Sequence, residues 1–264
     1  MRDGRLMAGS QGGHSGVANP REVQFPRSVG RGPLETAVVA TLAEATGRER
    51  RTDPVLPRTG GPAGNAVLTA WTAVVLLAVS LAEGLTLFDV RGLISWHVAL
   101  GALLVPPALL KTASTGWRMV RYYVGSPAYQ EAGPPPLPLR VLGPLVVVST
   151  LGLLGSGVLL VLLGPASSAR SVVSMLGFRL DWVGVHQGLF VVWLVVMTLH
   201  VLGRIVPALR ITWASVGGRA PVPGAWTRWL LLVATLAAAT TMAVALVHAD
   251  GSWVPPQHLF GRDD

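Results

Sequence analysis

Five long apolar stretches, separated by short polar segments, follow residue 65 of the chain. They run from about residue 66 to 88, 93 to 113, 141 to 164, 182 to 206 and 229 to 248. A helix needs roughly 20 mostly apolar residues to cross the hydrocarbon core of a bilayer. Each stretch meets this requirement. The pattern therefore predicts an all-α membrane protein with five transmembrane helices.

The polar segments divide the chain into three parts. Residues 1–65 are rich in Gly, Pro and Arg and contain no apolar core of the kind found in a secretory signal, which predicts a disordered tail. Residues 66–248 form the expected transmembrane domain, and residues 249–264 a short tail on the opposite side of the membrane.

The composition narrows the function further. Apolar residues make up 51% of the chain and charged residues only 13%, a membrane composition. The net charge is +8, yet the basic residues lie between apolar runs and form no patch suited to nucleic acid. The chain has no cysteine, which excludes disulfides, thiolate metal sites, iron–sulfur clusters and covalent c-type haem. Any metal must therefore bind to histidine or carboxylate.

The basic residues also predict the orientation, because Lys and Arg are retained on the cytoplasmic side of a membrane. Three alternate segments carry four basic residues each: Arg48, Arg50, Arg51 and Arg58; Lys111, Arg118, Arg121 and Arg140; Arg204, Arg210, Arg219 and Arg228. The opposite segments hold one or two each: Arg91; Arg170 and Arg179; Arg262. We expect a cytoplasmic N-terminus and an outer C-terminus. All basic residues but one are arginine, a bias typical of GC-rich bacterial coding, which points to a bacterial plasma membrane.

Few ionisable groups lie within the apolar stretches, and such groups are costly there unless they have a function. His97 and His186 each stand about four residues into helices that run inward, so they share a depth on the outer side. Two neutral imidazoles from facing helices suit the two axial positions of a haem iron, an arrangement for electron transfer. The alternative is that each histidine is an isolated polar residue bonded to a neighbouring helix.

Other residues could complete or compete with this pair. His200 follows His186 by fourteen residues, which places it on the same helix face about 21 Å further along. His248, at the outer end of the fifth helix, is the runner-up ligand or an interfacial residue. Glu83 could orient a ligand histidine, relay a proton, or reach outward to water. Gly101, Gly152, Gly155 and Gly157 leave room for a porphyrin or for a neighbouring helix.

A family resemblance rests on Trp96, His97 and Gly101 through Lys111 and Arg118, with the spacing from His186 to His200. In these features the chain resembles the bacterial cytochrome b561-like superfamily, which includes the membrane cytochrome b subunits of formate dehydrogenases and nickel–iron hydrogenases.

Over roughly residues 66 to 206, the resemblance implies a four-helix haem-binding bundle, which holds two haems b in that family, and the fifth transmembrane helix is one extra helix. His97 and His186 would be ligands of the outer haem iron, and His200 would face an inner haem. The family's fourth ligand, near the cytoplasmic start of the first helix, is missing. This chain has other residues at that depth: Leu68, Thr69, Trp71 and Thr72. One haem is favoured over two.

The expected function is that of a non-catalytic electron-transfer subunit. It would move electrons between an extracytoplasmic redox partner, docked over residues 165 to 181 and 249 to 264, and the quinone pool. By the same analogy, Lys111 and His200 would edge a quinone pocket, although Lys111 with its aromatic and basic neighbours also fits a plain interfacial anchor. The alternative is a haem-free transporter or assembly factor that uses its intramembrane histidines.

Overall fold

The computed structural model describes residues 32–49, 51–175, 178–217, 222–249, 251 and 253. Within these residues, five helices are long and apolar enough to cross a membrane, which confirms the number predicted. They are α2 (Gly61–Thr86), α3 (Ile94–Tyr123), α5 (Leu137–Ser168), α6 (Trp182–Val216) and α7 (Ala225–Ala249). The shorter elements are α1 (Pro33–Ala45), the 3-10 helix η1 (Leu87–Asp89), α4 (Pro127–Ala132), β1 (Ser171–Met175) and β2 (Phe178–Asp181).

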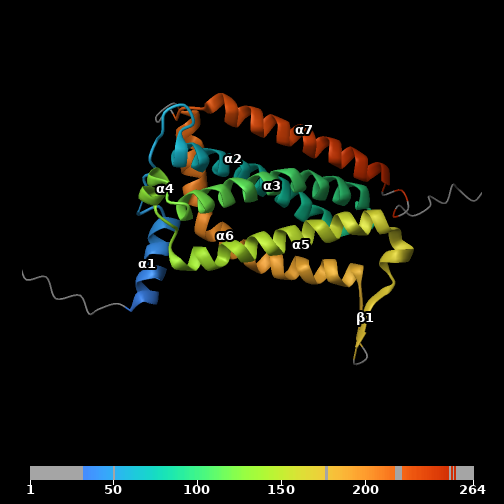
Figure 1. Cartoon of the computed structure of the whole chain (residues 1–264). Helices are drawn as coiled ribbons and strands as arrows, with labels where there is room; N and C mark the ends of the chain where they lie inside the picture. Colours follow the sequence, from blue (N-terminus) through green and yellow to red (C-terminus); the bar gives the residue numbers. More distant parts are fainter. Residues whose placement is uncertain are drawn as a thin grey trace, which may run out of the picture.

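The long helices run side by side between two ends of the molecule (Figure 1). One end carries α1 and α4 and is called the α1 end; the other carries β1 and β2 and is called the β1 end. Helix α3 packs against both α2 and α7, and α5 packs against α6. Contacts of α3 with α5 and of α2 with α6 join these groups. The result is a bundle of α2, α3, α5 and α6 with α7 added outside α3, as predicted.

Small residues allow the helices to approach closely near the β1 end. A cluster of buried residues there brings together Ala102 of α3, Val161 of α5, and Ala243 and Leu246 of α7. Small side chains are usual at helix contacts in membranes. The hydrophobic effect does not drive helices together in lipid, so their association depends on van der Waals packing, which small residues make close.

The connection from α5 to α6 forms a hairpin. The backbone of Gly164 (φ 70°) is not helical, and it bends α5 just before Pro165. Strands β1 and β2 then pair antiparallel, with an irregularity between Ser171 and Val173. This hairpin lies within residues 165–181, one of the two segments predicted from sequence to dock a partner.

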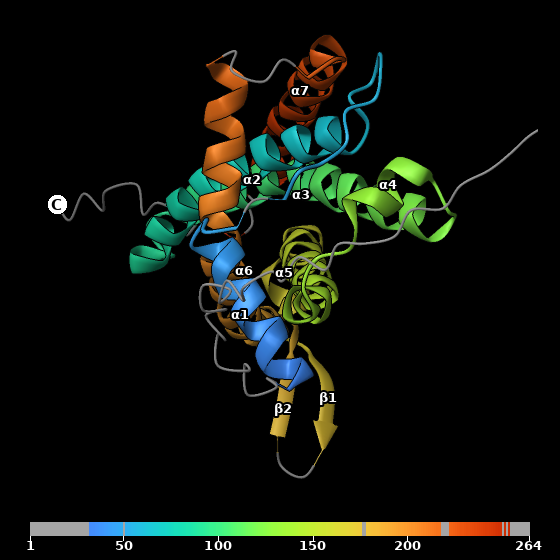
Figure 2. The ribbon, with the colours of Figure 1, turned by 90° about the vertical axis from the view of Figure 1, so that its left-hand side faces the viewer.

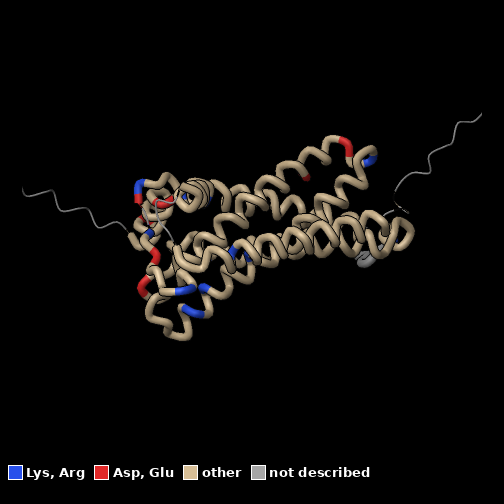
Figure 3. Tube along the Cα trace, turned by 90° about the horizontal axis from the view of Figure 1, so that it is seen from above, with Lys and Arg blue, Asp and Glu red and all other residues tan. Residues whose placement is uncertain are grey.

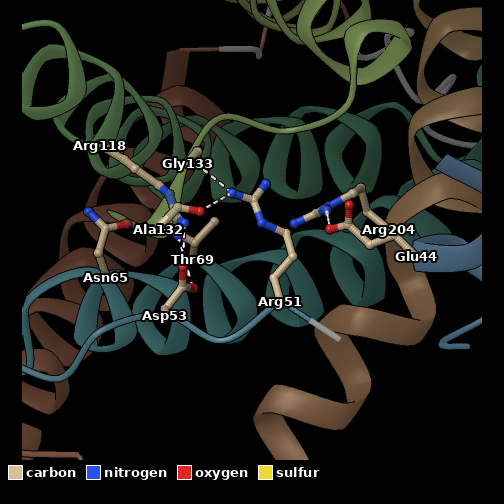
Figure 4. A network of polar contacts seen from close by, with 9 residues as sticks. All are labelled: Glu44, Arg51, Asp53, Asn65, Thr69, Arg118, Ala132, Gly133 and Arg204. Carbon is tan, nitrogen blue, oxygen red and sulfur yellow. Dashed lines mark hydrogen bonds and ion pairs between the residues drawn. The ribbon is translucent and has the colours of Figure 1, made fainter. Parts of the chain in front are cut away.

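The segment before the first span differs from the expected disordered tail of residues 1–65. Residues 1–31 lie outside the described part of the chain, but residues 33–45 form α1, which packs against α5 and α6. Glu44 of α1 pairs with Arg204 of α6, and Asp53 pairs with Arg118 of α3 (Figure 4). The two carboxylates order this segment because each finds an arginine on a spanning helix.

Arg51 strengthens the same attachment. Its Nη2 donates to the carbonyl oxygens of Ala132 (2.6 Å) and Gly133 (2.5 Å), at the C-terminal end of α4 (Figure 4). Burial, and then the neighbouring cation Arg118, lower the pKa of Arg51. The carbonyl acceptors and the negative ends of the peptide dipoles of α4 offset the free-energy cost of burying the guanidinium charge of Arg51.

Removing one charge should show how much this attachment contributes to stability. We expect Asp53→Asn to lower the free energy of unfolding by about 1–2 kcal/mol, because Arg118 loses a charged partner at a partly buried site. Thermal melting of the purified protein measures this as a lower melting temperature. Asp89→Asn is the matched control, since Asp89 is exposed and its carboxylate accepts from the amide of Gly92, a bond within the same turn. Equal melting of the two variants would contradict the prediction.

Helix α6 bends near Pro207, so that its last residues run across the α1 end of the bundle (Figures 1 and 2). Proline lacks the amide hydrogen needed for the bond to Gly203, and its ring crowds that carbonyl. After the bend, α6 crosses α2, where Trp71 Nε1 donates to Ser215 Oγ at 3.1 Å. Two helical segments, α1 and the end of α6, thus lie across this end of the bundle.

Candidate functional site

The structure brings His97 and His186 together near the β1 end of the bundle. His97 lies in the first turn of α3 and His186 in the second turn of α6. The centres of the two imidazole rings are 6.4 Å apart, and the ring planes are nearly perpendicular at 89°. Within the described residues, no other pair of histidine rings is in contact.

The Nδ1 atom of His97 is held by residues from the end of α2. It lies 2.9 Å from Thr86 Oγ1 and 2.7 Å from Glu83 Oε1. The Thr86 hydroxyl donates to the carbonyl oxygen of Glu83 at 2.6 Å, so it must accept from His97. A neutral His97 imidazole therefore carries its proton on Nδ1 and keeps the lone pair on Nε2.

The Nδ1 atom of His186 is held in the same way by α5. It lies 2.9 Å from Ser156 Oγ, and the Ser156 hydroxyl donates to the carbonyl oxygen of Leu153 at 2.9 Å. The hydroxyl thus accepts from Nδ1 of His186, and Nε2 again keeps its lone pair. In their neutral form, both rings would therefore be in the tautomer that binds a metal through Nε2.

The spacing of the rings fits one metal atom between them. Metal–imidazole bonds are about 2 Å long, which puts the centres of two opposed ligand rings roughly 6 Å apart. In the part of the chain that the structure describes, no group of three or more His, Asp or Glu residues gathers as a metal site. Two protein ligands are too few for a bare ion, but they suffice for an iron whose other four ligands come from a porphyrin.

A glycine makes the position of His186 possible. A Cβ atom at Gly157 of α5 would lie 3.2 Å from Cε1 of His186, closer than most real contacts. A Cβ atom at Gly155 would meet nothing within 4 Å, and one at Gly152 would lie 3.3 Å from Leu189. The missing side chain of Gly157 thus leaves room for the ring of His186, and that of Gly152 leaves room for Leu189 of α6.

Glu83 points into the bundle and not outward to water. Its side chain is 15% exposed, with Oε1 on His97 and Oε2 buried without a hydrogen-bond partner in the described chain. Of the three roles considered from sequence, orientation of His97 fits this geometry best. The sequence analysis missed Thr86 and Ser156, although each is a hydroxyl residue at the depth of a histidine in the adjacent apolar helix.

The residues near the other membrane surface form a separate polar cluster. Lys111 Nζ donates to the carbonyl oxygen of Thr69 at 3.3 Å, and Asn65 Nδ2 donates to the carbonyl oxygen of Ser114 at 2.9 Å. His200 lies partly buried on α6, within electrostatic range of Lys111. The structure shows no second histidine ring beside it among the described residues.

His248 lies apart from the pair of His97 and His186. It is exposed on α7, and its Nδ1 is 2.7 Å from the carbonyl oxygen of Val244, one turn earlier. This arrangement agrees with an interfacial residue, so His248 remains the runner-up ligand only.

Fold and site define a multi-pass α-helical membrane protein with one pair of oriented histidines between its helices. Searches against models of known protein families, curated proteins and solved structures each found no significant match to the chain.

Proposed function

We propose that the protein is an integral membrane b-type cytochrome that holds one haem b between His97 and His186. The observation that carries this proposal is the pair of neighbouring imidazoles, with ring centres 6.4 Å apart and each Nδ1 bonded to a residue of an adjacent helix. A haem bound there would supply one-electron chemistry, and His97 and His186 would both be ligands of its iron.

The surrounding residues fix the two ligands before any cofactor arrives. Thr86 and Glu83 hold His97 from α2, while Ser156 holds His186 from α5. Such partners keep the ring orientation and the tautomer, and a carboxylate also raises the basicity of the imidazole. The resemblance to the cytochrome b561-like superfamily supports the same assignment. His200 has no histidine opposite it in the described chain, so we propose one haem and not two.

The partners follow from the depth of the pair. From the basic flanks we infer a cytoplasmic N-terminus, which would put the histidine pair near the outer surface of a bacterial plasma membrane. An extracytoplasmic redox protein would exchange electrons there, near the β1–β2 hairpin, and a quinone in the membrane would be the other reactant. The chain would then be an electron-transfer subunit without substrate chemistry of its own.

An optical spectrum tests the proposal directly. The full chain is expressed in bacteria supplied with haem precursor, purified in detergent, and measured oxidised and after reduction with dithionite. A sharp b-type band on reduction, with about one haem per chain by extraction, is expected. Absence of the band despite ample haem would reject the cytochrome and favour the haem-free transporter or assembly factor.

Reporter fusions test the orientation. A phosphatase that is active only outside the cytoplasm should be active when fused after Asp264 and inactive when fused in the turn between α3 and α4, at Ser126. A fluorescent protein that matures only in the cytoplasm should give the opposite pattern. Activity of the phosphatase at Ser126 and not at Asp264 would invert the topology and move the histidine pair to the cytoplasmic side.

A further inference from the structure

Helix α1 is amphipathic in the opposite sense to a helix on a water-soluble protein. Its inward side consists of small or polar residues, with Glu44 buried and Ala37, Ala40 and Thr41 partly buried. Its large apolar residues face away from the protein: Leu34 is 71% exposed, Val38 48% and Leu42 57%. A surface helix in water normally turns its apolar stripe towards the core. The outer side of α1 therefore needs an apolar environment that the described chain does not supply.

The end of α6, after Pro207, repeats this arrangement. Thr212 is buried and Ser215 is bonded to Trp71, so the polar positions face the bundle. Leu209, Trp213 and Val216 face outward, and Trp213 is 73% exposed. Two separate segments at the same end of the molecule thus expose an apolar stripe at helical spacing.

Both segments lie across the ends of the spanning helices, so their axes run close to the plane of a membrane (Figure 2). Arg210 of α6 donates to the carbonyl oxygen of Gly47, just after α1, which ties the two segments together. Most of the described Lys and Arg residues gather at this end (Figure 3). Apolar residues with tryptophan and arginine in one shallow layer are typical of helices that lie in a bilayer interface.

We propose that α1 and residues 208–216 of α6 lie in the interfacial layer of the membrane at the α1 end, as a lipid-binding collar around the bundle. Leu34, Val38, Leu42 and Trp213 reach the boundary of the acyl chains, and the neighbouring arginines face the phosphates of anionic lipids. This proposal does not depend on haem binding.

The absence of cysteine makes the test direct, because one introduced cysteine carries the only spin label. Val38→Cys, Leu42→Cys and Trp213→Cys label the collar, and Arg48→Cys, exposed in the turn after α1, is the control in water. The full chain is reconstituted into vesicles containing phosphatidylglycerol. Collision rates of each label with oxygen, which concentrates in lipid, and with a water-soluble nickel complex are compared.

We expect the ratio of oxygen to nickel collisions to be several-fold higher at the collar positions than at position 48. We also expect this ratio to fall at position 38 in vesicles of uncharged lipid. A ratio at positions 38 and 42 equal to that at position 48 would place the stripe in water and overturn the proposal. Low collision rates with both reagents at these positions would also overturn it, because they would show a protein covering the stripe.

Discussion

Replacing His97 or His186 with alanine is expected to abolish haem binding, whereas His200→Ala should leave most of it. The reason is geometric: among the histidines that the structure describes, only His97 and His186 have rings in contact, with ring centres 6.4 Å apart. A haem held by one histidine would be bound far less tightly than a haem held by two, because one bond from imidazole to iron is lost. His200 lies on α6 about 21 Å further along the helix axis and has no such partner in the described chain.

The measurement is haem per chain in protein purified from membranes, with the reduced-minus-oxidised spectrum recorded for each variant. We expect about one haem per chain in the unaltered protein and in His200→Ala, and none in the other two variants. His248→Ala is a further control, because that side chain is exposed and bonded to its own helix. A ratio of two haems, halved by His200→Ala, would contradict the single site and imply a ligand other than histidine at the α1 end.

Gly157→Val is expected to reduce haem binding nearly as strongly as loss of a ligand histidine, although both histidines are still present. A Cβ atom at this position already lies 3.2 Å from Cε1 of His186, and the two methyl groups of valine must come closer still. The ring of His186 would have to rotate away and give up its bond to Ser156 Oγ. A displacement of about 1 Å at a positioned group is enough to cost function.

Gly155→Val provides the matched control on the same helix. A Cβ atom at Gly155 meets nothing within 4 Å, so the substitution has the same propensity effect but should leave the haem content unchanged. Both variants should insert and accumulate in the membrane to similar amounts. Equal haem content in the two variants would show that the space beside His186 does not limit binding.

The sequence predicts the spanning helices well because their length and apolar composition are local properties, and all five are confirmed. The shared depth of His97 and His186 also follows from position alone, since each lies near the start of its helix. The remaining site residues depend on helix rotation and contact. Thr86 and Ser156 are ordinary hydroxyl residues until the bundle places them 2.9 Å from an imidazole nitrogen.

The same limit explains the segment before the first span. The Gly, Pro and Arg content of this segment predicts disorder. The part around Glu44 and Asp53 is ordered because these residues pair with arginines of the spanning helices. Glu44 and Asp53 find their partners on α6 and α3, more than 60 residues away in sequence, as the pairs with Arg204 and Arg118 show. Pairing over such distances leaves no signal in the local pattern. The bend of α6 at Pro207 is similar: the proline predicts a kink, but only packing against α2 sets its direction.

The origin of each histidine's support has a consequence for assembly. His97 and its partners all come from α2 and α3, whereas His186 and its partner come from α5 and α6. Each antiparallel helix pair is therefore a complete half-site that can form as soon as its own two helices are in the membrane. Contacts of α3 with α5 and of α2 with α6 already hold the two pairs together. Under the proposed function, the cofactor would add a further connection between them, through one ligand from each pair.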